Sequence, residues 1–114
     1  MKLEENRTLD VGDFNLYFVG KRRINPEALI SWDQYIFRFE NNYGASVVQY
    51  KISESNIRFV NVLPTHMQGF EIAVIKFDED NLFDLVYDTP ITDDVITGLD
   101  NEEVLDILRK IKEL

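Results

Sequence analysis

The sequence predicts an α+β domain: an antiparallel β-sheet of about four to six strands, arranged as consecutive hairpins, with a C-terminal amphipathic helix packed on one face. Turn residues at 41–44 and at 78–81, each between two runs of β-type composition, predict two hairpins. After residue 99 the apolar residues change to helical spacing, which predicts the helix. The chain has 114 residues, 45% of them hydrophobic, as expected for a single domain spanning 1–114.

The first predicted hairpin lies near the middle of the chain. Aromatic residues alternate with other residues over 35–40, and Val and Tyr are frequent over 45–52, as in strands. The sequence Asn41-Asn42-Tyr43-Gly44 between them supplies residue types that accept a positive φ. We therefore expect two antiparallel strands here, with a further strand over 14–19 and a weaker one over 57–63.

The second predicted hairpin consists of an apolar run over 70–77 (FEIAVIKF), a loop over 78–81 and a returning strand over 82–87 (LFDLVY). Because side chains alternate between the two faces of a strand, one face of this hairpin should be apolar. We expect that face to bring together Ala73, Ile75, Phe77, Phe83, Leu85 and Tyr87. Asp84 is then expected on the opposite face.

Residues 99–114 predict an amphipathic helix that begins at a capping box. Asp100 can accept hydrogen bonds from the first free N–H groups, and Glu103 can reach back to the backbone of the cap residue. Basic residues follow in the last turns, where the helix dipole favours cations. Before this helix, the Pro and the acidic residues of 89–94 predict a short helical turn that Gly98 would end.

The charge of the chain is strongly asymmetric. The formal net charge is −9, yet residues 1–76 contain nine acids and nine bases, so the excess lies entirely in the last third. No Lys or Arg interrupts the acids between residues 77 and 108, whereas an ordinary solvated face mixes both signs. We expect these acids to form a partner-binding surface, and the alternative is a face that only keeps the protein soluble. The candidate residues are Asp78, Glu79, Asp80, Asp84, Asp88, Asp93, Asp94, Asp100, Glu102, Glu103 and Asp106.

Residues for catalysis are scarce, so we predict that the protein is not an enzyme and carries no cofactor. The chain has no Cys, its single His66 lacks a nucleophilic partner in the sequence, and its glycines form no phosphate-binding motif. The acids at 78–84 could surround Ca²⁺ or Mg²⁺, but they lack the Gly and the spacing of an EF-hand loop, so we expect no metal site. A small metal-dependent enzyme that uses the same carboxylates is a third, minority hypothesis.

The only basic run is Lys21-Arg22-Arg23, which we expect to form a charged turn before 24–26. It could also pair with part of the acidic third. The net charge opposes direct binding of nucleic acid. Acids within residues 1–20 and the lack of a long apolar run predict that the chain has no signal peptide and no membrane span. The lack of Cys leaves nothing that indicates an oxidising compartment, so we expect a cytoplasmic protein.

Several segments resemble a family of small uncharacterised proteins carried by phages and prophages of low-GC bacteria. The resemblance covers roughly residues 35–114. It lies in NYGASVV at 42–48, in FEIAVIKF at 70–77 and above all in YDTPITDDVI at 87–96, followed by Leu99 and Glu102-Glu103-Val104. It implies a phage gene that acts in the cytoplasm of a bacterial host, and it implies no activity or catalytic residue.

Phage origin and charge together suggest a non-enzymatic inhibitor. In this hypothesis the eleven acids occupy the basic groove of a host nucleic-acid-binding defence protein, such as a CRISPR effector nuclease, where carboxylates take the place of phosphates. The alternative is a phage accessory or assembly module that binds protein through an apolar edge or an aromatic patch. The sequence leaves the identity of the partner and the oligomeric state open.

Overall fold

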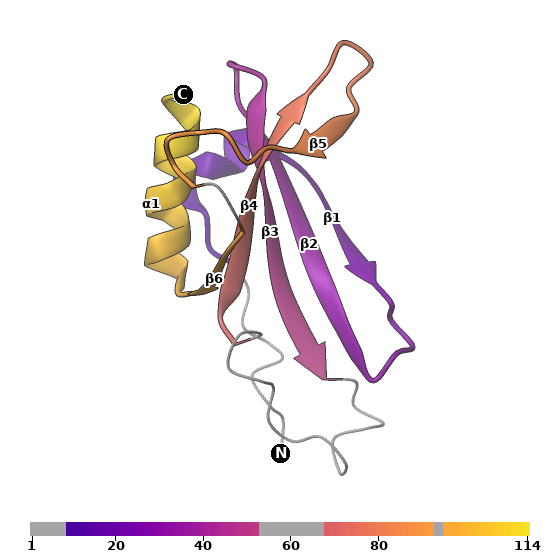
Figure 1. Cartoon of the computed structure of the whole chain (residues 1–114). Helices are drawn as coiled ribbons and strands as arrows, with labels where there is room; N and C mark the ends of the chain where they lie inside the picture. The colour runs from indigo at the N-terminus through magenta and orange to yellow at the C-terminus, as the bar shows by residue number, and fades with distance from the viewer. Residues whose placement is uncertain (1–8, 53–67, 93–94) are drawn as a thin grey trace.

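The protein is an antiparallel sheet with one helix on its face, as predicted (Figure 1). The computed structural model describes residues 9–52, 68–92 and 95–114. In chain order its elements are the 3-10 helix η1 (Gly12–Tyr17), the strands β1 (Phe18–Ile24), β2 (Ile30–Arg38), β3 (Tyr43–Ile52), β4 (Phe70–Phe77), β5 (Phe83–Leu85) and β6 (Ile96–Leu99), and the helix α1 (Asn101–Lys112).

The sheet is a meander in which each strand from β1 to β5 pairs with the next, and β6 pairs with β4. Strand β4 has β3 on one side, so β5 and β6 share its other side. β5 pairs with the end of β4 at Ile75–Phe77, and β6 pairs with the beginning of β4 around Phe70–Ile72. β4 is thus paired on both sides, and all of its residues are buried except Glu71 and Lys76.

The turn between β2 and β3 depends on two residues for different reasons. Asn42 adopts a φ of 68°, which favours Asn and Gly at this position. Gly44 has no positive φ, but a Cβ added there would lie 1.9 Å from the carbonyl oxygen of Phe37. Gly44 is therefore required by the close approach of two strands rather than by backbone conformation.

The β4–β5 hairpin forms, and its register places Ile75 opposite Leu85 and Phe77 opposite Phe83, so these four residues share a face as expected. Its loop is closed by the Asp78 carboxylate, whose Oδ1 accepts hydrogen bonds from the backbone N–H groups of residues 80 and 82, at 2.8 and 3.1 Å. The returning strand, Phe83–Leu85, is shorter at both ends than the predicted 82–87, although the N–H of Val86 still donates to the carbonyl oxygen of Val74 in β4 at 2.9 Å.

The main core lies between the sheet and α1, which packs on β3, β4 and β6. Helical spacing places Val104, Ile107, Leu108 and Ile111 on the buried side of α1. The capping box forms as predicted: Asp100 Oδ1 accepts from the Glu103 N–H at 2.8 Å, and Glu103 Oε1 accepts from the Asp100 N–H at 3.0 Å. The buried sheet residues of this core are Tyr35, Phe37, Ala45, Val47, Phe70, Ile72, Val74 and Leu99, with Phe39 just beyond β2.

Three predictions about local structure are wrong. Residues 14–17 belong to η1 rather than to a strand, and the Lys21-Arg22-Arg23 run lies within β1 rather than in a turn. Gly98 ends no helical turn, because 96–99 form β6. Gly98 instead lies where the β4–β6 register shifts, as in a β-bulge, and it adopts a φ of 70° there. The predicted strand at 57–63, His66, Asp93 and Asp94 lie outside the described residues.

Candidate functional site

The nine described acids of the predicted surface are all exposed, but they are distributed along the molecule. Asp78, Glu79, Asp80 and Asp84 lie in the β4–β5 hairpin, and Asp100, Glu102 and Glu103 lie at the start of α1. β4 separates these two groups, since its first residue pairs with Leu99 and its last residue borders the hairpin. Seven residue steps along a strand span roughly 23 Å. The acids therefore do not gather in one place (Figure 1).

Four of these acids have structural partners. Asp78 closes the hairpin loop, Asp100 and Glu103 form the capping box, and Asp106 pairs with Arg109 at 2.7 Å. Within the described part of the chain, the other five acids have no hydrogen bond or ion pair to a side chain: Glu79, Asp80, Asp84, Asp88 and Glu102. Three of those five are in the hairpin.

The hairpin also exposes apolar side chains. The exposed fractions are 66% for Leu82, 46% for Leu85 and 49% for Tyr87, just after β5. We call Glu79, Asp80, Leu82, Asp84 and Leu85 the hairpin surface; within it, Asp84 and Leu85 lie on opposite faces of β5, as expected from the sequence. Beside it is an open groove of about 570 Å³, whose lining residues include the acidic Asp78, Glu79 and Asp84, the apolar Leu85 and the cationic Arg38 and Lys76.

Arg38 fastens the hairpin to the rest of the sheet. Its guanidinium donates to Asn81 Oδ1 at 2.6 Å and to Asn42 Oδ1 at 3.0 Å, and it lies over the Phe77 ring at 4.6 Å from the centroid. One side chain thus joins the β2–β3 turn to the β4–β5 turn. The hairpin surface is consequently held in a defined position.

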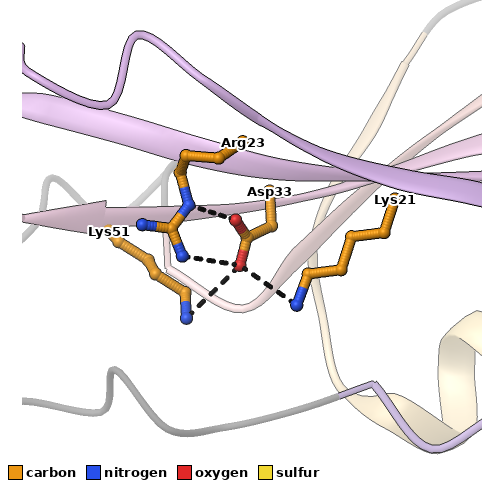
Figure 2. A network of polar contacts seen from close by, with 4 residues as sticks. All are labelled: Lys21, Arg23, Asp33 and Lys51. Atoms are coloured by element: carbon orange, nitrogen blue, oxygen red, sulfur yellow. Dashed lines mark hydrogen bonds and ion pairs between the residues drawn. The ribbon is translucent and has the colours of Figure 1, made fainter.

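A second polar site, which we call the Asp33 cluster, lies on the helix-side face of the sheet (Figure 2). Asp33 of β2 is 1% exposed, and Arg23 of β1 donates to both of its carboxylate oxygens, with Nη2 3.3 Å from Oδ2. Lys51 of β3 and Lys21 of β1 approach the same Oδ2 at 3.3 and 3.8 Å. Gln49 of β3 lies directly opposite Asp33, and its buried Oε1 accepts no hydrogen bond from the described residues. The cluster unites three cations around one buried anion.

The pKa values in the cluster follow from these contacts. Burial alone would raise the pKa of Asp33, but the hydrogen bond from Arg23 and the charges of Lys51, Arg23 and Lys21 outweigh it, so its pKa is lowered. The hydrogen bond to Asp33 also raises the pKa of Arg23. Both partners therefore remain charged over the whole physiological range.

Arg22, the middle residue of the basic run, lies on the face of the sheet opposite to the Asp33 cluster. Arg22 Nε donates to Gln34 Oε1 at 2.8 Å, and Gln34 Nε2 donates to Ser46 Oγ at 2.8 Å. The basic run therefore pairs with residues of β2. The sequence had also left open a pairing with the acidic third, and the described residues do not show it. Sequence reasoning did not identify Asp33, although its alternation with Tyr35 places it on the core face, where an unpaired carboxylate is costly.

The described residues contain no group of three or more His, Asp or Glu side chains that could hold a metal ion. Among the same residues, no helix is both long and apolar enough to cross a bilayer. Comparisons with protein families, with curated proteins and with solved structures find no match. The resemblance to phage proteins stays a prediction.

Proposed function

We propose that this chain is a non-enzymatic protein-binding module that docks its hairpin surface onto a basic surface of another protein. One observation carries the proposal: exposed carboxylates without partners among the described residues alternate there with exposed Leu82 and Leu85. Large exposed apolar side chains that are grouped together and rimmed by polar residues are typical of surfaces that contact other proteins. Carboxylates steer a basic partner into an encounter, and apolar side chains add short-range contact after the encounter.

The groove beside the hairpin suits the side chain of a Lys or Arg from the partner. Among the groove-lining acids, Glu79 and Asp84 have no side-chain partner among the described residues and would accept from a cationic head, and Leu85 would offer apolar contact for its aliphatic stem. The two cations in the groove are already engaged, because Arg38 binds Asn42 and Asn81, and Lys76 lies over the Tyr43 ring at 5.1 Å. They leave the acids available to a partner.

A host nucleic-acid-binding defence protein is one partner of this kind. Its basic groove would receive the hairpin where it otherwise receives phosphates, and the chain would act as an inhibitor by occupation. The support is the acidic hairpin together with the sequence resemblance to phage proteins. In this form of the hypothesis the hairpin acids make the contact, and the acids at the start of α1 contribute only to the long-range field.

Pull-down from a bacterial lysate at about 50 and 200 mM salt tests the proposal, because attraction between exposed charges is screened as salt rises. The test variant is E79K/D80K in the hairpin, and the matched control is E102K/E113K in α1. Both reverse two exposed acids and change the net charge from −9 to −5. We expect the wild type and the control to capture the same protein at low salt, and the hairpin variant to lose it.

Equal loss with both variants would contradict the hairpin docking, because it would show that only total charge matters. Capture that survives in both variants and at high salt would favour the assembly module with a merely solubilising acidic face. For the inhibitor hypothesis, the captured protein should bind nucleic acid, and this chain should displace that nucleic acid in a gel-shift assay.

A further inference from the structure

Strand β1 forms one edge of the sheet, at the opposite side from the hairpin. In the described part of the chain its outer side pairs with no strand, so it presents backbone N–H and C=O groups. Every residue of β1 except Gly20 and Ile24 is exposed. Such an edge can accept an additional strand from another chain.

The cations of β1 are held in place. Lys21 and Arg23 point to the helix side, where Asp33 binds both, and Lys21 also lies 5.3 Å from the centroid of the Tyr35 ring. Arg22 points to the other side, where Gln34 binds it at 2.8 Å. Charges that only discourage aggregation need no such supports, and burying the Asp33 carboxylate carries a desolvation cost. The supports indicate that the positions of these cations matter.

The cations also keep donors for a ligand. Arg23 uses Nε and Nη2 to bind Asp33, and its Nη1 has no partner among the described residues. The side chains of Lys21 and Arg23 are each 45% exposed despite their contact with the buried carboxylate. No acid occurs between Asp13 and Glu27, so this edge is a cationic strip on a chain of net charge −9.

We propose that the outer edge of β1 binds an extended acidic segment of another protein, which adds a strand to the sheet. Backbone pairing supplies the contact, and three consecutive acids of the segment face Lys21, Arg22 and Arg23 on alternating sides. The exposed Val19 of β1, at 60%, precedes the strip and favours an apolar residue at that end of the acidic run. This surface is independent of the hairpin surface, because it lies on the opposite edge.

Two other occupants fit the edge less well. A second copy of this chain paired β1 to β1 would bring one cationic run against another, which is unfavourable for directly opposed side chains. A nucleic acid strand follows one face with its phosphates, whereas Arg22 points away from Lys21 and Arg23. An acidic strand satisfies both the backbone edge and the alternation of the cations.

Fluorescence anisotropy with the full chain and labelled peptides tests this proposal. The probe is the peptide Thr-Val-Ile-Glu-Asp-Glu-Ile-Val-Thr, and the controls are the same peptide N-methylated at alternate residues, a version with three Lys in the centre, and a single-stranded oligonucleotide of nine nucleotides. We expect the acidic probe to bind, more weakly at 200 than at 50 mM salt, and the N-methylated and Lys peptides to bind at least tenfold more weakly.

R22E should weaken binding of the acidic probe by about tenfold or more, the loss that corresponds to one charge-assisted contact. The matched control is R109E on the exposed side of α1, which changes the net charge equally and should leave binding unchanged. R22Q provides a second variant if R22E fails to fold by circular dichroism. Equal binding of the N-methylated peptide, tighter binding of the oligonucleotide, or equal effects of R22E and R109E would each overturn the proposal.

Discussion

Replacing Asp33 with Asn should destabilise the protein more than the same replacement of Asp106, the other acid that forms an ion pair among the described residues. Asn has nearly the same shape as Asp but no charge, and it retains only one acceptor oxygen. Arg23 donates to both oxygens of Asp33, and Lys51 lies 3.3 Å away. The change therefore removes one hydrogen bond and leaves three cations close together without their counter-ion.

The magnitude depends on how well those cations can reach water. Removing one partner of a fully buried ion pair costs about 3–5 kcal/mol. Here Arg23 and Lys21 are each 45% exposed and can be hydrated, whereas Lys51 is only 17% exposed. We therefore expect a smaller loss, about 2–3 kcal/mol in the free energy of unfolding at neutral pH, which is a large part of the stability of a small domain.

Urea denaturation followed by circular dichroism measures this loss. With a slope of about 1.5 kcal/mol per M urea, the midpoint should fall by roughly 1.3–2 M while the slope stays constant. The control is D106N, which removes an ion pair whose side chains are 61% and 65% exposed. That variant should lose less than about 0.5 kcal/mol. A midpoint for D33N no lower than that of D106N would refute the energetic role of the cluster.

The wild type and D33N can also be compared as a function of pH. The pKa of Asp33 is lower in the folded protein than its ordinary value, so its contribution is fully present above that ordinary value, about 3.9. The contribution is lost as the pH falls through the lower folded pKa, where the folded protein must protonate it. The difference in unfolding free energy between wild type and D33N should therefore be constant from pH 7 to about 5 and shrink toward pH 2. A difference that stays constant down to pH 2 would contradict this assignment.

Three further predictions concern other parts of the fold. In urea denaturation, G44A should lower the free energy of unfolding by more than about 2 kcal/mol, because the added Cβ would collide with the β2 backbone. The control G20A should be nearly neutral, because no atom lies within 4 Å of its added Cβ. D100A should cost about 1 kcal/mol in the same assay, because it removes the N-cap of α1. Burial raises the pKa of Tyr50, and the neighbouring Glu71 carboxylate raises it further. E71Q should therefore lower the pH at which Tyr50 ionises in an absorbance titration. An unchanged titration would contradict the role of Glu71.

The sequence was sufficient wherever a local rule decides the structure. The apolar run over 70–77 coincides with β4, because β-branched and aromatic residues favour strands. The capping box at Asp100 and Glu103 depends only on residues within one turn, so it could be predicted from their spacing. The turn at Asn42 could be predicted from its residue type, because few residues accept a positive φ.

Where pairing between distant segments decides the structure, sequence reasoning failed. Residues 96–99 form β6 because β5 pairs only with the end of β4 and leaves the first half of β4 open to another strand. No local pattern in the sequence predicts this open position. The basic run at 21–23 looked like a turn, but it forms an edge strand because it lies in register with β2. Neither result follows from composition or from short-range spacing.

For the candidate sites, composition determined the signs of the charges and the tertiary structure decided their arrangement. The sequence by itself established an acidic chain with one basic run, an antiparallel sheet and a C-terminal helix, because these depend on residue type, alternation and capping. Only the fold separated the hairpin acids from those at the start of α1 and brought Lys21, Arg23 and Lys51 onto Asp33. The physical reason is that charges act over a few ångströms in space, and strand register sets those distances.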